Sequence, residues 1–526
     1  VIAAAVATMV AGAMMSAPAF AEGQGEGAEN PTPKYDLKVD GIQETNEQGQ
    51  IYGIKLIGGD YINNGPNGSN AKARYGDHSI VHNANITGDA GLVLGKDVLE
   101  QRLKELAVVY QNDEPAYIDV VGGGVVYGSV GMFQTENSAN VSGNVKIDIS
   151  DYSTEGNSGH GALSIKPAIV ESGVGQANVG GNVDIILKNV HASDSDIQGG
   201  GSINGYKVGT GVPPVNAEAI VNGDITIKVE NALLSFIDGG GNAEARPNDG
   251  TNSTFVKCDA TVKGDVTIDL KNTKLELADY LKEDNERSVL AGGGASENGS
   301  VADVLGNVTI SLTDKSSVDL MYGGGCTGTD RSEDNYDPQN KPALKAGQSA
   351  KVGKNVSITL DNSSVDWMLI AGGITTESFY YNESNKPQYL VDGGDAAVYG
   401  NTSVTLRNHA SVNDVYMAGY GKGSDVKGDA LLTIEDASVN VAGTLHGQGY
   451  NSTTRSSTLA FGTKDKAYTG DFKGKFVDFD EVSASDGSKV NLGTINSANR
   501  APSRSEVNQE SWLKFAGNGE FKANLD

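Results

Sequence analysis

The chain has few of the residues that define several large classes of protein. Its 526 residues include 2 cysteines, 13 prolines and 6% aromatic residues, and 40 basic residues stand against 67 acidic ones. One disulfide at most is hardly a framework for a chain of this length. The 70 glycines follow no Gly-X-Y period, which excludes collagen. The net charge of −27 would repel nucleic acid and anionic membranes, so we expect neither as a partner.

Signatures of catalysis are also scarce. The sequence holds no Gly-x-Ser-x-Gly, Walker A, His-Glu-x-x-His or Cys-x-x-Cys motif. Residues 323–328 match Gly-x-Gly-x-x-Gly, but a polar acidic loop follows them where a nucleotide site needs a helix. We therefore expect no cofactor and no enzymatic activity. Past the N-terminus, no apolar stretch reaches the ~18 residues that a membrane span needs.

The N-terminal residues are typical of an export signal. Residues 1–21 are small and apolar and end in an Ala-x-Ala site, which predicts cleavage between Ala21 and Glu22. A basic segment and an initiating Met are missing, so we expect the printed sequence to begin inside the signal peptide. Residues 22–50 are rich in Gly, Glu, Gln and Pro and are predicted to form a disordered linker.

One sequence motif recurs from residue 140 onward. It places an apolar residue and a glycine before an Asn or Asp, and a strand of alternating apolar and polar residues follows. The intervals between these Asn or Asp residues are 38 to 48 residues, and the last is 28. Self-similarity at such a period indicates a solenoid or array. The eight residues are Asn144, Asn182, Asp224, Asp265, Asn307, Asn355, Asn401 and Asp429.

A second motif follows the first in most units. An apolar pair precedes Gly-Gly-Gly, which suits close approach of neighbouring backbones or a positive φ. Two strands persist while the polar loop after the glycines varies. We predict an all-β fold, a parallel β-helix or β-solenoid with Gly/Asn-rich repeats. Stacking would bring the eight Asn or Asp side chains into a column that binds turn backbone. One rung or two per repeat fits the spacing, and a seven-bladed propeller is the rival fold.

The two ends differ from the middle. Residues 97–110 have the pattern of one amphipathic helix, and we place it in a small N-terminal cap over residues 51–118. Such a cap would cover the open edge of the first strands. The solenoid repeats are expected over residues 119–450. Residues 451–526 are expected to form the last rungs and a C-terminal cap.

A few side chains are candidates for chemistry, each with a plainer alternative. His160 fits a ligand or base, or a solvated loop. Asp330, Glu333, Asp334 and Asp337 fit a Ca²⁺ loop, but without the spacing of a defined site. Residues 379–381 (Phe-Tyr-Tyr) fit a sugar or protein contact, or strand-edge packing. Cys258 and Cys326 fit a disulfide or incidental packing. None of these sets predicts a defined metal site.

The whole resembles the passenger domain of autotransporters, the self-exporting surface proteins of Gram-negative bacteria. The features that carry the resemblance are the Ala-x-Ala signal, the Gly/Asn/Ser-rich repeats, the low cysteine content and the segment Tyr468–Val482. This segment is similar to the Phe-x-Gly-Phe-Asp phrase near the end of such domains. The resemblance implies a right-handed parallel β-helix with adhesin-like function. It also implies a C-terminal membrane barrel, whose alternating strands are absent up to Asp526.

Two functional classes follow. The favoured one is an exported cell-surface or secreted protein that displays variable loops on a rigid stalk. Its partners would be proteins or glycans of a host or neighbouring cell, and only a missing barrel would contact the outer membrane. The alternative is a β-helix polysaccharide lyase or glycoside hydrolase. That class needs charged residues stacked in one groove, whereas the solvated positions of the repeated strands mix Lys, Asp, Thr and Ser.

Overall fold

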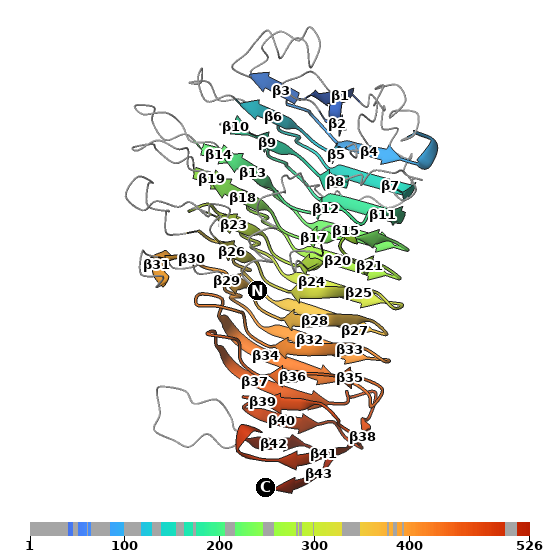
Figure 1. Cartoon of the computed structure of the whole chain (residues 1–526), viewed down its shortest axis with the longest axis vertical. Coiled ribbons are helices and arrows are strands. Elements are labelled where there is room, and N and C mark those ends of the chain that lie inside the picture. The colour runs from blue at the N-terminus through green and yellow to red at the C-terminus, as the bar shows by residue number, and fades with distance from the viewer. Residues whose placement is uncertain are drawn as a thin grey trace, which may run out of the picture.

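The protein is an elongated parallel β-solenoid, which confirms the predicted fold class (Figure 1). The computed structural model describes residues 40–45, 51–59, 61–64, 85–98, 117–128, 138–153, 163–171, 175–205, 216–245, 257–279, 282, 287–297, 299–328, 348–375, 378–381, 387–391, 394–499 and 513–525. Strands from successive repeats pair in parallel and in register, so each repeat adds one rung. The choice between one and two rungs per repeat is thereby settled as one.

Face A is formed by the strands that follow the recurring Asn or Asp. Its apolar residues alternate with polar ones along each strand, and the apolar set points into the solenoid. Neighbouring strands match like with like, as in Ile227 beside Ile268 and Ile268 beside Ile310. In order along the solenoid, the strands are β4 (Ala90–Leu94), β7 (Val145–Ser153), β11 (Val183–His191), β15 (Ile225–Glu230), β20 (Val266–Lys271), β24 (Val308–Thr313), β27 (Val356–Asp361), β32 (Thr402–Arg407), β34 (Val426–Ile434), β37 (Thr454–Phe461), β40 (Glu481–Ala484) and β42 (Lys514–Gly517).

Face B carries the strand that precedes the glycines in each rung. Its strands are β2 (Ile51–Ile57), β5 (Tyr117–Val121), β8 (Leu163–Lys166), β12 (Ser195–Gln198), β17 (Phe236–Asp238), β22 (Val289–Ala291), β25 (Ser317–Tyr322), β28 (Ser364–Ile370), β33 (Ser411–Tyr416), β36 (Thr444–His446) and β39 (Lys475–Val477). Short strands extend it toward face A: β16 (Leu233–Leu234), β21 (Lys274–Leu275) and β35 (Asn440–Val441).

Face C begins directly after the glycines. Its strands are β3 (Tyr61–Asn64), β6 (Val125–Gly128), β9 (Ile169–Glu171), β13 (Ser202–Gly205), β18 (Asn242–Ala245), β23 (Ala295–Glu297), β26 (Cys326–Gly328) and β29 (Ile374–Thr375). A smaller parallel set on the return to face A contains β10 (Gly175–Gln176), β14 (Asn216–Glu218) and β19 (Lys257–Asp259). One continuous apolar core lies inside the three faces.

The glycines between faces B and C are required by lack of space. A Cβ atom on Gly239 would lie 2.6 Å from Cγ1 of Val266 on face A and 2.6 Å from the backbone oxygen of Gly292 in the next rung. A Cβ atom on Gly240 would lie 2.3 Å from the backbone nitrogen of Gly294. Of the two predicted reasons for glycine, close backbone approach is therefore the one that applies. We call this bend the BC corner.

The N-terminal end departs from the predicted boundaries in one respect. Residues 40–45, which the sequence places in a disordered linker, form β1 (Asp40–Thr45), which pairs antiparallel with β2. The physical reason is that β1 satisfies backbone groups on one edge of β2. Within residues 51–118, β2, β3 and β4 pair in parallel with solenoid strands. Residues 96–98 are helical, and the rest of the predicted helix at 97–110 lies outside the described residues.

The C-terminal rungs are filled by aromatic side chains. Tyr468, Phe472, Phe476 and Phe479 are buried, and neighbouring rings lie 5.1 to 6.5 Å apart between centroids, beginning at Phe461. The segment that carries the family resemblance is therefore packed inside the solenoid. The remaining elements here are β38 (Thr469–Asp471), β41 (Lys489–Ile495), β43 (Glu520–Leu525) and the 3₁₀ turn Ser497–Asn499.

Three further predictions concern the cleavage site, the two cysteines and membrane spans. The predicted cleavage site at Ala21 and Glu22 lies outside the described residues. Cys258 and Cys326 are both buried free thiols and form no disulfide with each other. Among the described residues, no helix is long and apolar enough to cross a membrane.

Candidate functional site

The eight repeated Asn and Asp residues lie in one column at the turn before face A, which we call the first turn column. From Asn182 to Asn401, each Oδ1 atom accepts the backbone N–H of its counterpart in the next rung, at 2.7 to 3.3 Å, whereas Asp429 Oδ1 accepts Arg455 Nε at 2.9 Å. The column begins one rung earlier than the repeat suggested, because Asp89 Oδ1 accepts the N–H of Asn144 at 3.2 Å. Since these oxygens are used by backbone, the column holds turns in place and is not a ligand site.

A second turn column lies between faces A and B, and the sequence predicted it only in part. Its residues adopt positive φ angles near 50°, a conformation that Asn and Asp tolerate better than other non-glycine residues. Side-chain amides also pair along it, as in Asn272 Nδ2 to Asn231 Oδ1 at 2.8 Å. The members are Asp151, Asn189, Asn231, Asn272, Asp314, Asn362 and Asn408. The sequence predicted a short Asn/Ser/Asp turn here, without the conformation.

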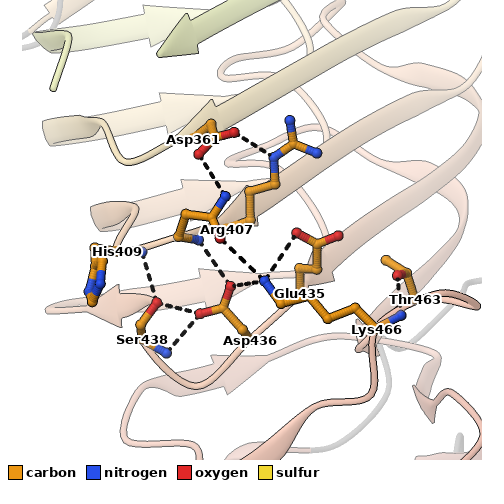
Figure 2. Close-up of polar contacts among 9 residues, drawn as sticks. Asp361, Arg407, His409, Glu435, Asp436, Ser438, Thr463 and Lys466 are labelled. Atoms are coloured by element: carbon orange, nitrogen blue, oxygen red, sulfur yellow. Dashed lines mark hydrogen bonds and ion pairs between the residues drawn. The ribbon is translucent and has the colours of Figure 1, made fainter. Parts of the chain in front are cut away.

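Lys466 closes the second turn column at its C-terminal end (Figure 2). Its Nζ atom lies 2.8 Å from Asp436 Oδ2 and donates to Asn408 Oδ1 at 3.2 Å. Burial raises the pKa of Asp436, but hydrogen bonds from Lys466 and Ser438 outweigh that effect and hold this pKa well below its usual range. Because every group in this cluster has a partner, we assign it to stabilisation of the turn.

The BC corner is different, because outward side chains from faces B and C converge there. Ala291, Tyr322 and Ile370 end strands of face B, and Cys326 and Ile374 begin strands of face C. These side chains pack together in an apolar cluster separate from the core. Contacts between outward groups on two faces show that the chain bends inward at the glycines. The corner is therefore a concave line along the solenoid.

The N-terminal end of the corner is charged. Lys55 lies 2.9 Å from Asp119 and 3.1 Å from Glu171, and Lys166 lies 3.9 Å from Asp196. Lys55, Asp119 and Lys166 are nearly inaccessible, whereas 19% of the Asp196 side chain is exposed. Buried charges that are paired in this way are stabilised against the cost of desolvation.

Two carboxyl groups in this region have altered acidity. Burial raises the pKa of Asp196 to about 6, against the opposing effect of Lys166. Burial and the neighbouring Asp196 raise the pKa of Asp238 to about 8. At neutral pH, Asp238 is thus mostly protonated and Asp196 mostly ionised. This pair was not predicted from the sequence, because both residues fall in the variable strand before the glycines and not in the repeated strand of face A.

The C-terminal end of the corner is aromatic. Tyr416 of β33 stacks on His446 of β36, with ring centroids 4.3 Å apart and an interplanar angle of 5°. Across the corner, Tyr420 stacks on Tyr450 at 4.6 Å and 17°. Tyr416 and Tyr420 meet edge to face at 6.0 Å. The sequence alone does not single out these rings, whose only signal is that Tyr420 and Tyr450 each directly follow a glycine.

The other candidates from the sequence lie elsewhere in the chain. His160 and the acidic loop at 330–337 lie outside the described residues. Phe379 to Tyr381 belong to β30 (Ser378–Tyr381), which pairs antiparallel with β31 (Pro387–Val391). The described residues contain no group of three or more His, Cys, Asp or Glu side chains arranged to hold a metal ion.

Comparison with known proteins identifies no relative. No family model matches the chain, and neither the curated proteins nor the solved structures contain a match.

Proposed function

We propose that this chain is an exported, adhesin-like binding or structural protein that displays loops on a rigid stalk. The supporting observation is the contrast, within each rung, between regular turns and a variable connection. Asn and Asp columns hold the turns on either side of face A and glycines form the BC corner, while the connections after face C differ in length and sequence, for example 206–215, 246–256 and 329–347. Variable connections anchored along one edge of a regular scaffold are a common arrangement for recognition.

Cell binding by loop variants tests this proposal. Purified protein carrying a fluorophore would be added to cultured epithelial cells and to other bacteria. Replacing 206–215, 246–256 and 329–347 by short Gly-Ser linkers should abolish binding while the melting temperature is retained. Asp184→Ala, on the outer surface of face A, is the matched control and should bind normally. Undiminished binding after all three replacements, or no binding by the unmodified protein, contradicts the proposal.

Export as an autotransporter passenger is part of the same proposal. Its support is the Ala-x-Ala site and the packing of the segment Tyr468–Val482 in the C-terminal rungs. The mature protein, isolated from its native cells, should begin at Glu22. Removing residues 468–492 from the complete gene product should sharply lower the amount of folded protein on the cell surface. Normal surface levels after this deletion would count against passenger identity.

Cleavage of polysaccharide is a second candidate, and one observation favours it. At the charged end of the BC corner, Asp119 and Asp196 both align with Ser164, whereas Asp238 aligns with Gln198. Together with Lys166, these acids lie on four successive rungs of face B, in two neighbouring columns. A protonated and an ionised carboxyl group are what a glycosidase pair needs. Incubation with pectin, alginate and xylan, followed by a reducing-end assay, tests it. Cleavage that is lost in Asp238→Asn supports an enzyme, and intact polymers exclude one for these substrates.

A further inference from the structure

The aromatic end of the BC corner differs in exposure from the rungs before it. Tyr322, Ile370 and Ile374 occupy the corner in the preceding rungs and are at most 1% exposed. In the next two rungs, Tyr416, Tyr420 and His446 are only partly covered, and Tyr450 is 52% exposed. Tyr450 stacks on Tyr420 and still keeps about half of its surface open to solvent, so an aromatic face is available here for contact with a ligand.

The rings form two parallel rows that follow the solenoid axis. One row contains Tyr416 and His446 on face B, and the other contains Tyr420 and Tyr450 across the bend. Each row advances by one rung, about 4.8 Å. That step is close to the length of one hexose unit in an extended chain, so consecutive sugar units can meet consecutive rungs.

Carboxylates flank the rings. Asp414 lies two residues before Tyr416 in β33, and its Oδ1 accepts the backbone N–H of Thr444 at 2.8 Å. Asp478 follows β39, which pairs with the strand of His446. The electrostatic fields of both acids reach His446, although burial is the larger effect and lowers the pKa of this imidazole. Asp478 makes no side-chain hydrogen bond to another described residue that would occupy its oxygens. This end of the corner is thus apolar and acidic, which disfavours anionic ligands such as uronates.

We propose that the aromatic end of the BC corner binds an uncharged oligosaccharide lying along the solenoid axis. Tyr420 and Tyr450 contact the apolar C–H faces of the sugar rings, and Tyr416 and His446 form the opposite wall. The carboxylate of Asp478 accepts hydrogen bonds from sugar hydroxyl groups. This inference deepens the proposed binding function and rests on it for its biological role, while its chemistry can be tested separately.

Calorimetric titration of the full chain tests the proposal. The probes are tetrasaccharides of β-1,4-linked glucose and of β-1,4-linked N-acetylglucosamine, with tetragalacturonate as the anionic comparison. We expect at least one neutral probe to bind and tetragalacturonate to bind at least tenfold more weakly. Tyr450→Ala should weaken binding about tenfold or more. Tyr399→Ala is the matched control, because Tyr399 is 50% exposed but lies outside the corner, and it should leave affinity unchanged.

A second variant, Asp478→Asn, changes the carboxylate and leaves the aromatic rings in place. It should weaken sugar binding without lowering the melting temperature. Absence of binding by both neutral probes overturns the inference, as does equal affinity of Tyr450→Ala and the unmodified chain. Tighter binding of choline or tetralysine than of either sugar overturns it in favour of a cationic ligand. If Tyr450→Ala loses sugar binding but still adheres to cells, the inference stands and adhesion uses other surfaces.

Discussion

Asp265 Oδ1 accepts two hydrogen bonds from Asn307, one from its backbone N–H at 2.7 Å and one from its Nδ2 at 3.1 Å. The backbone N–H of Asp265 in turn donates to Asp224 Oδ1 at 2.8 Å. One side-chain oxygen therefore joins each rung to the next at the turn before face A. The column needs an oxygen acceptor at every rung, and both Asp and Asn supply one.

The first prediction concerns this acceptor. Asp265→Ala should lower the free energy of unfolding by about 1 kcal/mol, because the N–H of Asn307 loses its partner. Asp265→Asn keeps Oδ1 and should stay within about 0.5 kcal/mol of the unmodified chain. Denaturant titration followed by circular dichroism measures both. Equal losses for the two variants would show that charge, and not the acceptor, matters at this position.

The second prediction concerns the glycines of the BC corner. Gly240→Ala should destabilise the chain by more than about 3 kcal/mol, because its Cβ would lie 2.3 Å from a backbone nitrogen that has no room to move. Gly95→Ala is the control, since the nearest atom to its Cβ, Ser150 Oγ, is 3.9 Å away. Thermal unfolding distinguishes the two. Similar melting temperatures for both variants would mean that the corner relaxes readily.

The third prediction concerns pH. The pKa of Asp238 is raised to about 8 in the folded chain, so the folded state binds its proton more tightly than the unfolded state does. The contribution of this group to stability is therefore complete below about pH 4 and is lost as pH rises toward 8. Asp238→Asn should remove this pH-dependent loss of stability. The melting temperature of the variant, relative to that of the unmodified chain, should therefore rise between pH 5 and 9. A difference between the two chains that does not change with pH would falsify the assignment.

The fourth prediction concerns the two thiols. Burial raises the pKa of the Cys326 thiol, and the side chains of both Cys326 and Cys258 are buried, so a reagent in solution reaches neither sulfur atom in the native chain. A thiol reagent such as dithionitrobenzoate should react with neither residue in the native chain within an hour. Both should react at once in guanidinium chloride. Fast reaction of one thiol in the native chain would indicate local opening at the rung that contains it.

The sequence was sufficient for the parts of the fold that repeat. The period of the Asn and Asp residues and the alternation in strands such as Val266–Lys271 predict parallel stacking, because each depends on local chemistry repeated along the chain. The strand at 40–45 was not predicted. Its partner is β2, and its polar composition resembles a linker, so only tertiary pairing identifies it.

The BC corner could not be predicted for a related reason. Its columns run through positions whose residue types change from Lys166 through Asp238 to Tyr322 and Tyr416, so they carry no repeated signature. Whether such residues gather depends on the inward bend at the glycines and on the register between rungs. The sequence contains both, but only the folded chain shows that outward side chains from two faces meet there.

Because each repeat adds one rung, the length of the solenoid depends on the number of repeats and not on the number of residues in each repeat. The interval of 48 residues between Asn307 and Asn355 and the interval of 28 between Asn401 and Asp429 each advance the axis by one strand spacing, about 4.8 Å. Extra residues in a repeat therefore leave the length of the axis unchanged. The number of rungs thus sets the length of the solenoid, so an insertion between strands increases the mass of the chain but leaves the distance between neighbouring rungs unchanged.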